Sequence, residues 1–284
     1  MLQLLCVGKR AACSMAGNTS TDADNRFMQT ANLSGKRDNM RNGFIITILV
    51  LLSGSFSCQK NNDVSRNDIS GKIIYQDNFL NLDNWHFEGL VERVTNPEPG
   101  IMRLDCSGSQ QGKIGCMSFC KLDFPDNISI EYDMYVEAKN GLVITFLGMK
   151  GINGEDAIIG VPNRTGVFAD YISKNATTRS YHVSVSRYND KAEHTGVSNW
   201  RRNPGIHLMG QGPDPCKEIN KWYHVNIIKK GHVCELYVDG EFVSGFTDPQ
   251  RIEDEIPTSG KIGFRTIGSH AVARISNFKV SSLN

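Results

Sequence analysis

Short segments in which polar and apolar residues alternate recur from residue 129 to residue 268, and they constrain the fold of the chain more than any other feature. Polar and apolar residues alternate over 129–137, 142–149, 181–188, 222–230, 232–246 and 260–268. These segments are rich in β-branched and aromatic residues and are bounded by Gly, Asn, Asp or Pro, as strands are. Asp239-Gly240 separates two alternating runs and predicts a tight hairpin. Because no helix-length amphipathic stretch stands out, we expect an all-β sandwich or barrel.

The composition is that of a globular protein and narrows the range of partners. Of the 284 residues, 39% are hydrophobic and 21% are charged, which supplies a core and argues against disorder. The formal net charge is +1 at pH 7, so the basic face of a nucleic-acid-binding protein is not expected. We therefore expect no nucleic-acid partner.

The segment MRNGFIITILVLLSGSFSCQKNN, residues 40–62, has the organisation of a secretory signal. A membrane-spanning helix needs about 20 apolar residues. The apolar run 44–52 is too short for one. The letters SFSC, ending at Cys58, resemble a bacterial lipoprotein cleavage box, in which the cysteine is lipidated. An ordinary signal peptide is the alternative.

We therefore expect a lipoprotein signal peptide over 40–58 and a polar tether over 59–70. Residues 1–39 are either an unstructured extension or a mis-called start, and 71–284 form the folded domain. The expected location is the bacterial cell envelope, anchored in the outer membrane and facing the periplasm or the surface. Contact with the membrane is expected only through the lipid on Cys58.

Five of the eight cysteines fall within 71–284: Cys106, Cys116, Cys120, Cys216 and Cys234. Their number is odd, so at least one has no partner within the domain. We interpret them as small buried residues with one optional bridge. Their spacing does not match a zinc site, so no metal or other cofactor is expected, although a structural calcium ion at Asp77 and Asp248 is allowed for.

The last third of the chain has a recurring order of segments. WYHVNIIKKGHVCELYVDGEFVSGF, GKIGFRTIG and AVARISNFKV resemble the C-terminal half of concanavalin-A-like jelly rolls. IIYQDNF near residue 75 resembles their opening strand, which pairs with the last one. The resemblance implies a jelly-roll sandwich of two antiparallel sheets over 71–284.

The middle of the chain resembles a more specific group, the YesU-like bacterial proteins. The matching segments are Tyr181–Tyr188, Asn199–Pro215 and Trp222–Lys230. The resemblance implies the concanavalin-A-like lectin/glucanase fold and an association with pectin, especially rhamnogalacturonan. It implies a glycan-related role but no defined reaction.

Strand parity suggests where a sugar site would lie. Along YHVSVSRY, the polar residues His182, Ser184, Ser186 and Tyr188 share one face. That face is either plain solvent-exposed surface or the face on which such folds bind sugars. The segment RRNPGIHLMGQGPDP, residues 201–215, adds a strand between two loops, and functional residues concentrate on loops held by a rigid sheet.

Arginines close to these strands fit an acidic glycan, because a guanidinium grips a carboxylate in a two-pronged fork. Alternatively, they pair with nearby acids and order the loop, and Trp200 either stacks on a sugar ring or packs in the core. The expected substrate-binding residues are Arg164, Ser186, Arg187, Asn199, Trp200, Arg202, Asn203, Gln211 and Asp214.

If the protein is an enzyme, β-elimination suits these residues better than hydrolysis. His182 or His207 would be the base, Tyr188 the acid, and Arg201 or Arg202 would neutralise a uronate carboxylate. The alternatives are a non-catalytic lectin-like module, a glycoside hydrolase and a protein-binding laminin-G-like domain.

The hydrolase alternative depends on EYDMYVE, residues 131–137, which places Glu131, Asp133 and Glu137 on one strand face. Its E-x-D-x-x-x-E spacing is one residue longer than the E-x-D-x-x-E strand of laminarinase-like enzymes. Alternating acids on an exposed sheet explain the segment more simply.

Overall fold

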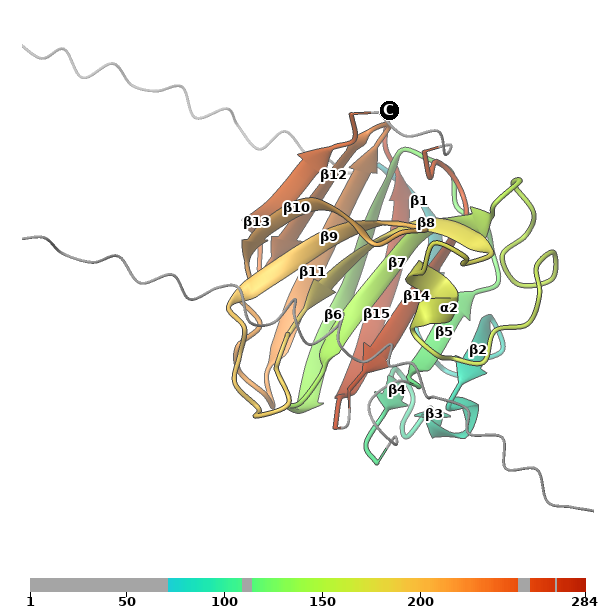
Figure 1. Cartoon of the computed structure of the whole chain (residues 1–284). Helices are drawn as coiled ribbons and strands as arrows, with labels where there is room; N and C mark the ends of the chain where they lie inside the picture. Colours follow the sequence, from blue (N-terminus) through green and yellow to red (C-terminus); the bar gives the residue numbers. More distant parts are fainter. Residues whose placement is uncertain (1–70, 109–113, 250–255, 269) are drawn as a thin grey trace, which may run out of the picture. The chain divides into compact units, whose positions relative to one another are not determined.

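The computed structural model describes residues 71–108, 114–249, 256–268 and 270–284 (Figure 1). The expected extension, signal peptide, Cys58 and tether lie outside the described residues. In the described part, no helix is both long and apolar enough to cross a bilayer.

The described residues from 71 onward form two antiparallel sheets, which confirms the all-β jelly-roll sandwich. The first sheet runs in the order β13 (Glu241–Thr247), β12 (Val233–Val238), β11 (Trp222–Lys230), β6 (Ile128–Ala138), β15 (Val272–Ser282), β4 (Met102–Asp105) and β3 (Val94–Thr95). The strand β1 (Lys72–Asp77) also pairs with β15.

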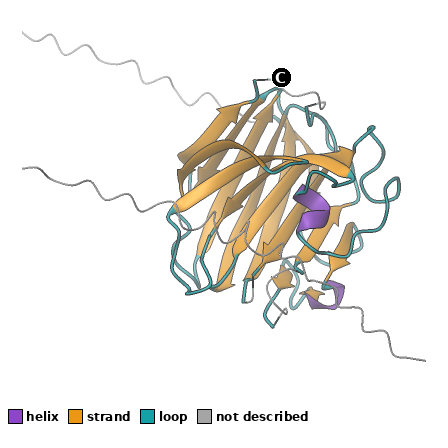
Figure 2. Cartoon of the chain, viewed as in Figure 1, coloured by secondary structure: helices purple, strands orange, loops and turns teal. Residues whose placement is uncertain are grey.

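The second sheet runs in the order β10 (His207–Pro213), β9 (Val197–Asn203), β8 (Thr178–Val185), β7 (Leu142–Gly151), β14 (Lys261–Ile267), β5 (Cys116–Cys120) and β2 (Trp85–Gly89). The helical segments among the described residues are short: η1 (Val91–Arg93) and α2 (Ala169–Ile172). Figure 2 shows α2 lying over the second sheet.

Two details of the strand pairing agree with the sequence patterns. Lys72 at the start of β1 is opposite Ser282 at the end of β15, so the opening and closing strands pair as expected. Asp239 and Gly240 join β12 to β13 with φ angles of 51° and 81°. Positive φ at both central positions is what a tight hairpin turn matched to the strand twist requires.

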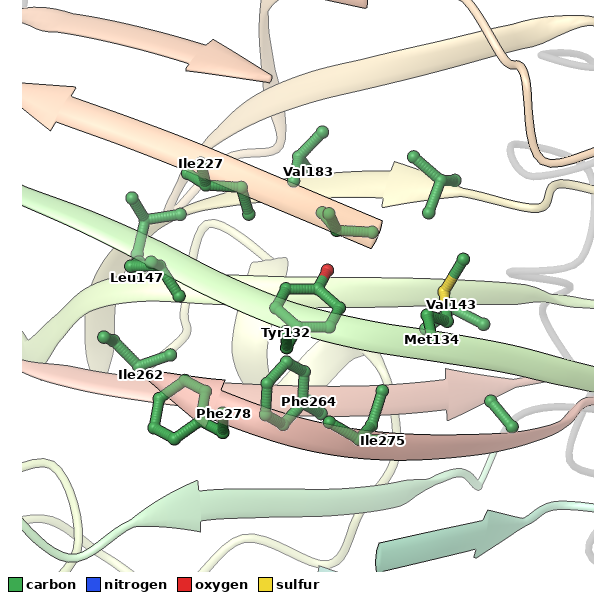
Figure 3. Packing of buried hydrophobic residues seen from close by; sticks show 14 of the residues in the cluster. Tyr132, Met134, Val143, Leu147, Val183, Ile227, Ile262, Phe264, Ile275 and Phe278 are labelled. Carbon is green, nitrogen blue, oxygen red and sulfur yellow. The ribbon is translucent and has the colours of Figure 1, made fainter. Parts of the chain in front are cut away.

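The main core lies between the two sheets, where every second side chain of each strand points inward. Figure 3 shows Tyr132, Ile227 and Phe278 from the first sheet packed with side chains of the second sheet such as Leu147 and Phe264. The hydroxyl of Tyr132 lies 2.6 Å from Oγ1 of Thr145, so this contact within the core joins the two sheets.

The outer face of the second sheet is divided into an apolar part and a polar part. Over β5, β14 and β7, Phe119, Ile144 and Phe146 pack beneath the segment 152–177, which carries α2 and contributes Tyr171. Over β8 and β9 the outward side chains are polar, and β10 adds Leu208 and Gln211 beside them. The position of the candidate site follows from this division.

Candidate binding site on the outer face of the second sheet

Strand register brings polar side chains together on the outer face of β8 and β9. His182 is opposite Arg201, Ser184 is opposite Asn199, and Ser180 is opposite Asn203. Directly opposed residues of an antiparallel pair lie on the same face. The inward neighbours Val183 and Trp200 are in the core, so this polar row faces away from the first sheet.

Gln211 extends the row onto β10, because it is opposite Asn199. Its Nε2 lies 2.7 Å from Oδ1 of Asn199. With the Asn199 amide turned so that its oxygen faces Arg187, that oxygen instead accepts hydrogen bonds from Nη1 at 2.7 Å and Nη2 at 3.2 Å, and the amide nitrogen donates to the carbonyl of Ser198 at 3.0 Å. The Asn199 amide therefore lies between Gln211 of the edge strand and the guanidinium of Arg187.

His182 is the centre of this row and is neutral. Its ring is buried, and Nδ1 lies 2.9 Å from Nδ2 of Asn203, which also donates to Oγ of Ser180 at 3.0 Å. Burial and, after it, the positive charges of Arg201, Arg187 and Arg265 together lower the pKa of His182 to about 3. With Asn203 donating to Nδ1, the ring proton resides on Nε2, so the ring is a hydrogen-bond donor.

Arg187 reaches this face because the strand ends before it. Ser186 has a φ of 50°, a left-handed conformation that interrupts the alternation of β8. The backbone N–H of Arg187 donates to Oδ2 of the fully buried Asp214 at 2.9 Å, which fixes the new direction of the chain. Asp214 is therefore an anchor beneath the site, not a ligand contact as expected.

Of the residues expected to act with His182, Arg201 lies beside it, whereas Tyr188 and His207 lie elsewhere. Tyr188 follows the break at Ser186, is buried, and donates its hydroxyl to the carbonyl of Lys217. His207 is opposite Arg202, whereas His182 is opposite Arg201. Because adjacent residues of a strand face opposite ways, His207 and His182 do not project into one site.

Trp200 and Arg202, two further expected binding residues, are structural. Trp200 is fully buried and packs on Phe246, with ring centroids 5.4 Å apart, so it cannot stack on a sugar. Arg202, the next inward residue of β9, donates to both carboxylate oxygens of Asp248 at 3.0 and 3.1 Å.

Arg164 belongs to the segment 152–177 itself and is also structural. Its Nε and Nη2 donate to the two carboxylate oxygens of Glu88 at 2.8 and 2.6 Å, and its side chain is 3% exposed. The guanidinium that was expected to bind a glycan carboxylate therefore binds a carboxylate of the protein itself.

The acids of residues 131–137 lie on the outer face of the first sheet and are paired with Lys, Arg and His side chains. Lys279 lies 2.9 Å from Glu131, and Nδ1 of His224 lies 2.8 Å from Asp133. Glu137 accepts from Arg103 and Arg274. These pairings on the outer face of a sheet account for the three acids, in agreement with the interpretation that they are alternating acids of an exposed strand.

The described residues were considered next as possible metal ligands. No group of three or more His, Cys, Asp or Glu side chains is close enough there to hold an ion. Asp77 accepts from Trp85, Tyr75 and the backbone of Phe79, while Asp248 accepts from Arg202 and from the Tyr181 hydroxyl. Because both carboxylates already accept hydrogen bonds from protein groups, they do not fit the structural calcium ion considered for Asp77 and Asp248.

Of the three arginines whose charges act on His182, Arg265 is the one absent from the expected site residues. It lies on β14, opposite Ile144 of β7, and is fully buried. The available signal was the single arginine of the segment GKIGFRTIG, next to the apolar Phe264.

Known protein families and proteins match most of the folded part of the chain. The family model described as "Domain of unknown function (DUF1961)" matches residues 72–280. The uncharacterized protein YesU of Bacillus subtilis (strain 168) is 30% identical over 153 residues, which are 52% of this chain and 68% of that protein.

Solved structures match over a similar extent. A Bacillus subtilis protein of unknown function with a galectin-like fold superposes with a TM-score of 0.65 at 23% identity, covering 75% of this chain and 96% of that one. The kappa-carrageenase of Pseudoalteromonas carrageenovora, in complex with an oligotetrasaccharide of kappa-carrageenan, gives a TM-score of 0.50 at 10% identity, covering 78% and 99%. At these identities, the likeness is one of fold.

Proposed function

The chain belongs to the DUF1961 family, and we propose that it binds an acidic polysaccharide on the outer face of β8, β9 and β10. The observation that carries this proposal is the cluster around His182. Arg201, Arg187 and Arg265 are the charges that act on its ring, and no carboxylate is among them. A face with that balance attracts a carboxylate or sulfate group.

The neighbouring side chains suit a sugar. Ser184, Asn199 and Gln211 line the same row and supply hydroxyl and amide groups that both donate and accept, as sugar hydroxyls require. Leu208, opposite Arg201, is half exposed and offers an apolar surface beside the charge. The sandwich shared with the kappa-carrageenase supports a saccharide partner at the level of fold.

Binding without turnover fits the geometry better than β-elimination. A base that abstracts a proton near neutral pH needs a pKa near 7, whereas the pKa of His182 is about 3. The acid and the second base expected at Tyr188 and His207 lie away from it. The protein is therefore a lectin-like module, and pectic polymers of the rhamnogalacturonan type are its first candidate ligands.

The test is a calorimetric titration of the full chain with oligogalacturonate and with its carboxyl-reduced, neutral counterpart. Wild-type protein is expected to bind only the acidic form, more weakly at higher salt. Arg201→Lys keeps the charge but loses the fork, and we expect about tenfold weaker binding. Arg274→Lys, on the first sheet, is the matched control and should bind like wild type.

Two results would refute the proposal. Equal binding of the neutral and acidic oligosaccharides would remove the role of the arginines. An affinity lowered equally by Arg201→Lys and Arg274→Lys would show a nonspecific charge effect. A rise in unsaturated-uronate absorbance during the titration would restore the lyase interpretation.

We also propose that the binding domain is displayed at the cell envelope by a lipid on Cys58. The short apolar run and the SFSC letters support this. In the native bacterium, Cys58→Ser should abolish incorporation of labelled fatty acid and move the protein from the membrane to the soluble fraction. Unchanged labelling would rule out the anchor.

A further inference from the structure

Arg265 is a buried cation without a carboxylate partner among the described residues, so the fold alone does not explain why a charged residue lies there. Its side chain is fully buried on β14, and Nη2 donates to the carbonyl of Gly166 at 2.7 Å. Neither Nε nor Nη1 has a hydrogen-bond acceptor in the described structure. A guanidinium is expensive to bury without a counter-charge, and proteins seldom do so without a functional reason.

Glu88, the acid that binds the Tyr171 hydroxyl, is already engaged by another arginine. Glu88 accepts from Nε and Nη2 of Arg164 and from the hydroxyl of Tyr171 at 2.6 Å. Arg164 and Arg265 both lie over the ring of Tyr171, 5.4 and 4.8 Å from its centroid. Of these two arginines around one tyrosine, Arg164 has a carboxylate partner, whereas Arg265 has none among the described residues.

Burial lowers the pKa of Arg265, while its neighbours Tyr171, Cys106 and Cys116 act in the opposite direction without offsetting it. A hydrogen bond from Cys116 and, more weakly, the charge of Arg265 lower the pKa of the Cys106 thiol to about 7. These neighbours reduce the cost of burying Arg265, but none of them is a carboxylate.

The ring of Phe168 connects Arg265 to the site around His182. Its centroid lies 5.2 Å from the Arg265 guanidinium and 6.2 Å from the His182 ring. Phe168 is only partly buried and immediately precedes the four-residue helix α2. Phe168 is thus the side chain that contacts both Arg265 and the face that carries His182 and Arg201.

We infer that Arg265 forms a second anion-binding subsite of the same face, covered by Phe168, which takes a carboxylate or sulfate group of the glycan. This rests on the proposed function and extends it. The ligand then carries at least two acidic groups, one for Arg201 and one for Arg265, which favours a polymer with repeated acidic sugars over one with an isolated charge.

The first test compares Arg265→Met with Arg164→Met by thermal unfolding of the full chain. Methionine fills much of the volume of arginine without its charge. Arg265→Met should match or exceed the wild-type Tm, because it removes an uncompensated buried charge. Arg164→Met leaves Glu88 without its partner and should lower the Tm by more than about 5 °C. A comparable fall in Arg265→Met would show a structural role and overturn the inference.

The second test measures the rise in Tm on adding sodium galacturonate or sodium sulfate, against sodium chloride at equal ionic strength. Wild-type protein should be stabilised and Arg265→Met should not. Stabilisation by galacturonate alone identifies a carboxylate ligand, and stabilisation by sulfate alone identifies a sulfate ester. Equal shifts in both proteins, or none in wild type, would overturn the subsite.

The same variant separates this inference from the proposed function. With oligogalacturonate, Arg265→Met should bind about tenfold more weakly than wild type, and Phe168→Ala should associate faster. If Arg201→Lys weakens binding and Arg265→Met does not, the function stands and the subsite fails. If galacturonate stabilises only proteins that retain Arg265 while the polymer does not bind, the subsite stands and the polysaccharide function fails.

Discussion

At the scale of single residues, the environment of His182 decides the chemistry of the site. Arginines surround the ring, and the amide of Asn203 contacts Nδ1. The same imidazole in a more exposed setting beside a carboxylate would be a general base. Here it is a fixed donor, so the residue type alone indicates a site but not its function.

The low pKa of His182 gives the folded protein a specific pH dependence. The ring is neutral when folded, with a pKa of about 3, but it binds a proton near pH 6.5 when the chain unfolds. Its contribution to stability is therefore complete above pH 6.5 and is lost as the pH falls toward 3. The slope approaches about 1.4 kcal/mol per pH unit.

Urea unfolding of wild type and His182→Asn between pH 7 and 5, above the range of most carboxylates, measures this contribution. The free energy of unfolding of wild type should fall more steeply with decreasing pH than that of the variant. Parallel curves would mean that His182 is not buried in its neutral form.

The two tryptophans of β9 and β11 provide a second contrast between residues. Trp200 is fully buried, while Trp222 is 44% exposed and packs on Tyr135. Trp200→Ala should lower the free energy of unfolding by about 3–5 kcal/mol, and Trp222→Ala by less than about 1.5 kcal/mol. Chemical denaturation checks both, and similar losses would contradict the placement of Trp200 in the core.

At the scale of strands, alternation predicts faces correctly as long as the backbone stays extended. It places His182 and Ser184 on one face and Val183 on the other, as found. It fails at Ser186, where a positive φ turns the chain and separates Tyr188 from His182. It fails again in the turn before β10, where Ile206 has a φ of 53° and His207 moves to the other face. Neither break is visible in the pattern of polar and apolar residues.

The edge strand β10 is held against β13 of the other sheet by glycines. A Cβ on Gly212 would lie 2.4 Å from the carbonyl oxygen of Val243 and 2.7 Å from Cβ of Ser244. Gly212→Ala must therefore push the strands apart, at a cost of about 1–3 kcal/mol in the free energy of unfolding. Gln211→Ala, on the same strand but exposed, should change it by no more than about 0.5 kcal/mol. Equal stability of the two variants would refute this close approach.

At the scale of the whole molecule, the resemblance of long segments indicated the architecture, because a jelly roll fixes which distant strands pair. The pairing of β1 with β15 follows from it. The resemblance predicted the candidate site less completely than the architecture. The partners of Arg164 and Arg202, Glu88 and Asp248, are distant in the sequence, 76 and 46 residues away. Only the folded chain shows that these arginines are occupied and that Arg265 joins His182.

Hydrogen–deuterium exchange of the full chain with and without oligogalacturonate tests the central claim most directly, because it reports which face the ligand covers. We expect slower exchange in peptides from β8 and β9, residues 178–203, and in the adjoining part of β10. Peptides from β6 and the first half of β11, with Glu131 and Trp222 on the other sheet, should exchange as before. Protection confined to β6 and β11, or no protection at a saturating concentration that calorimetry confirms, would contradict the account.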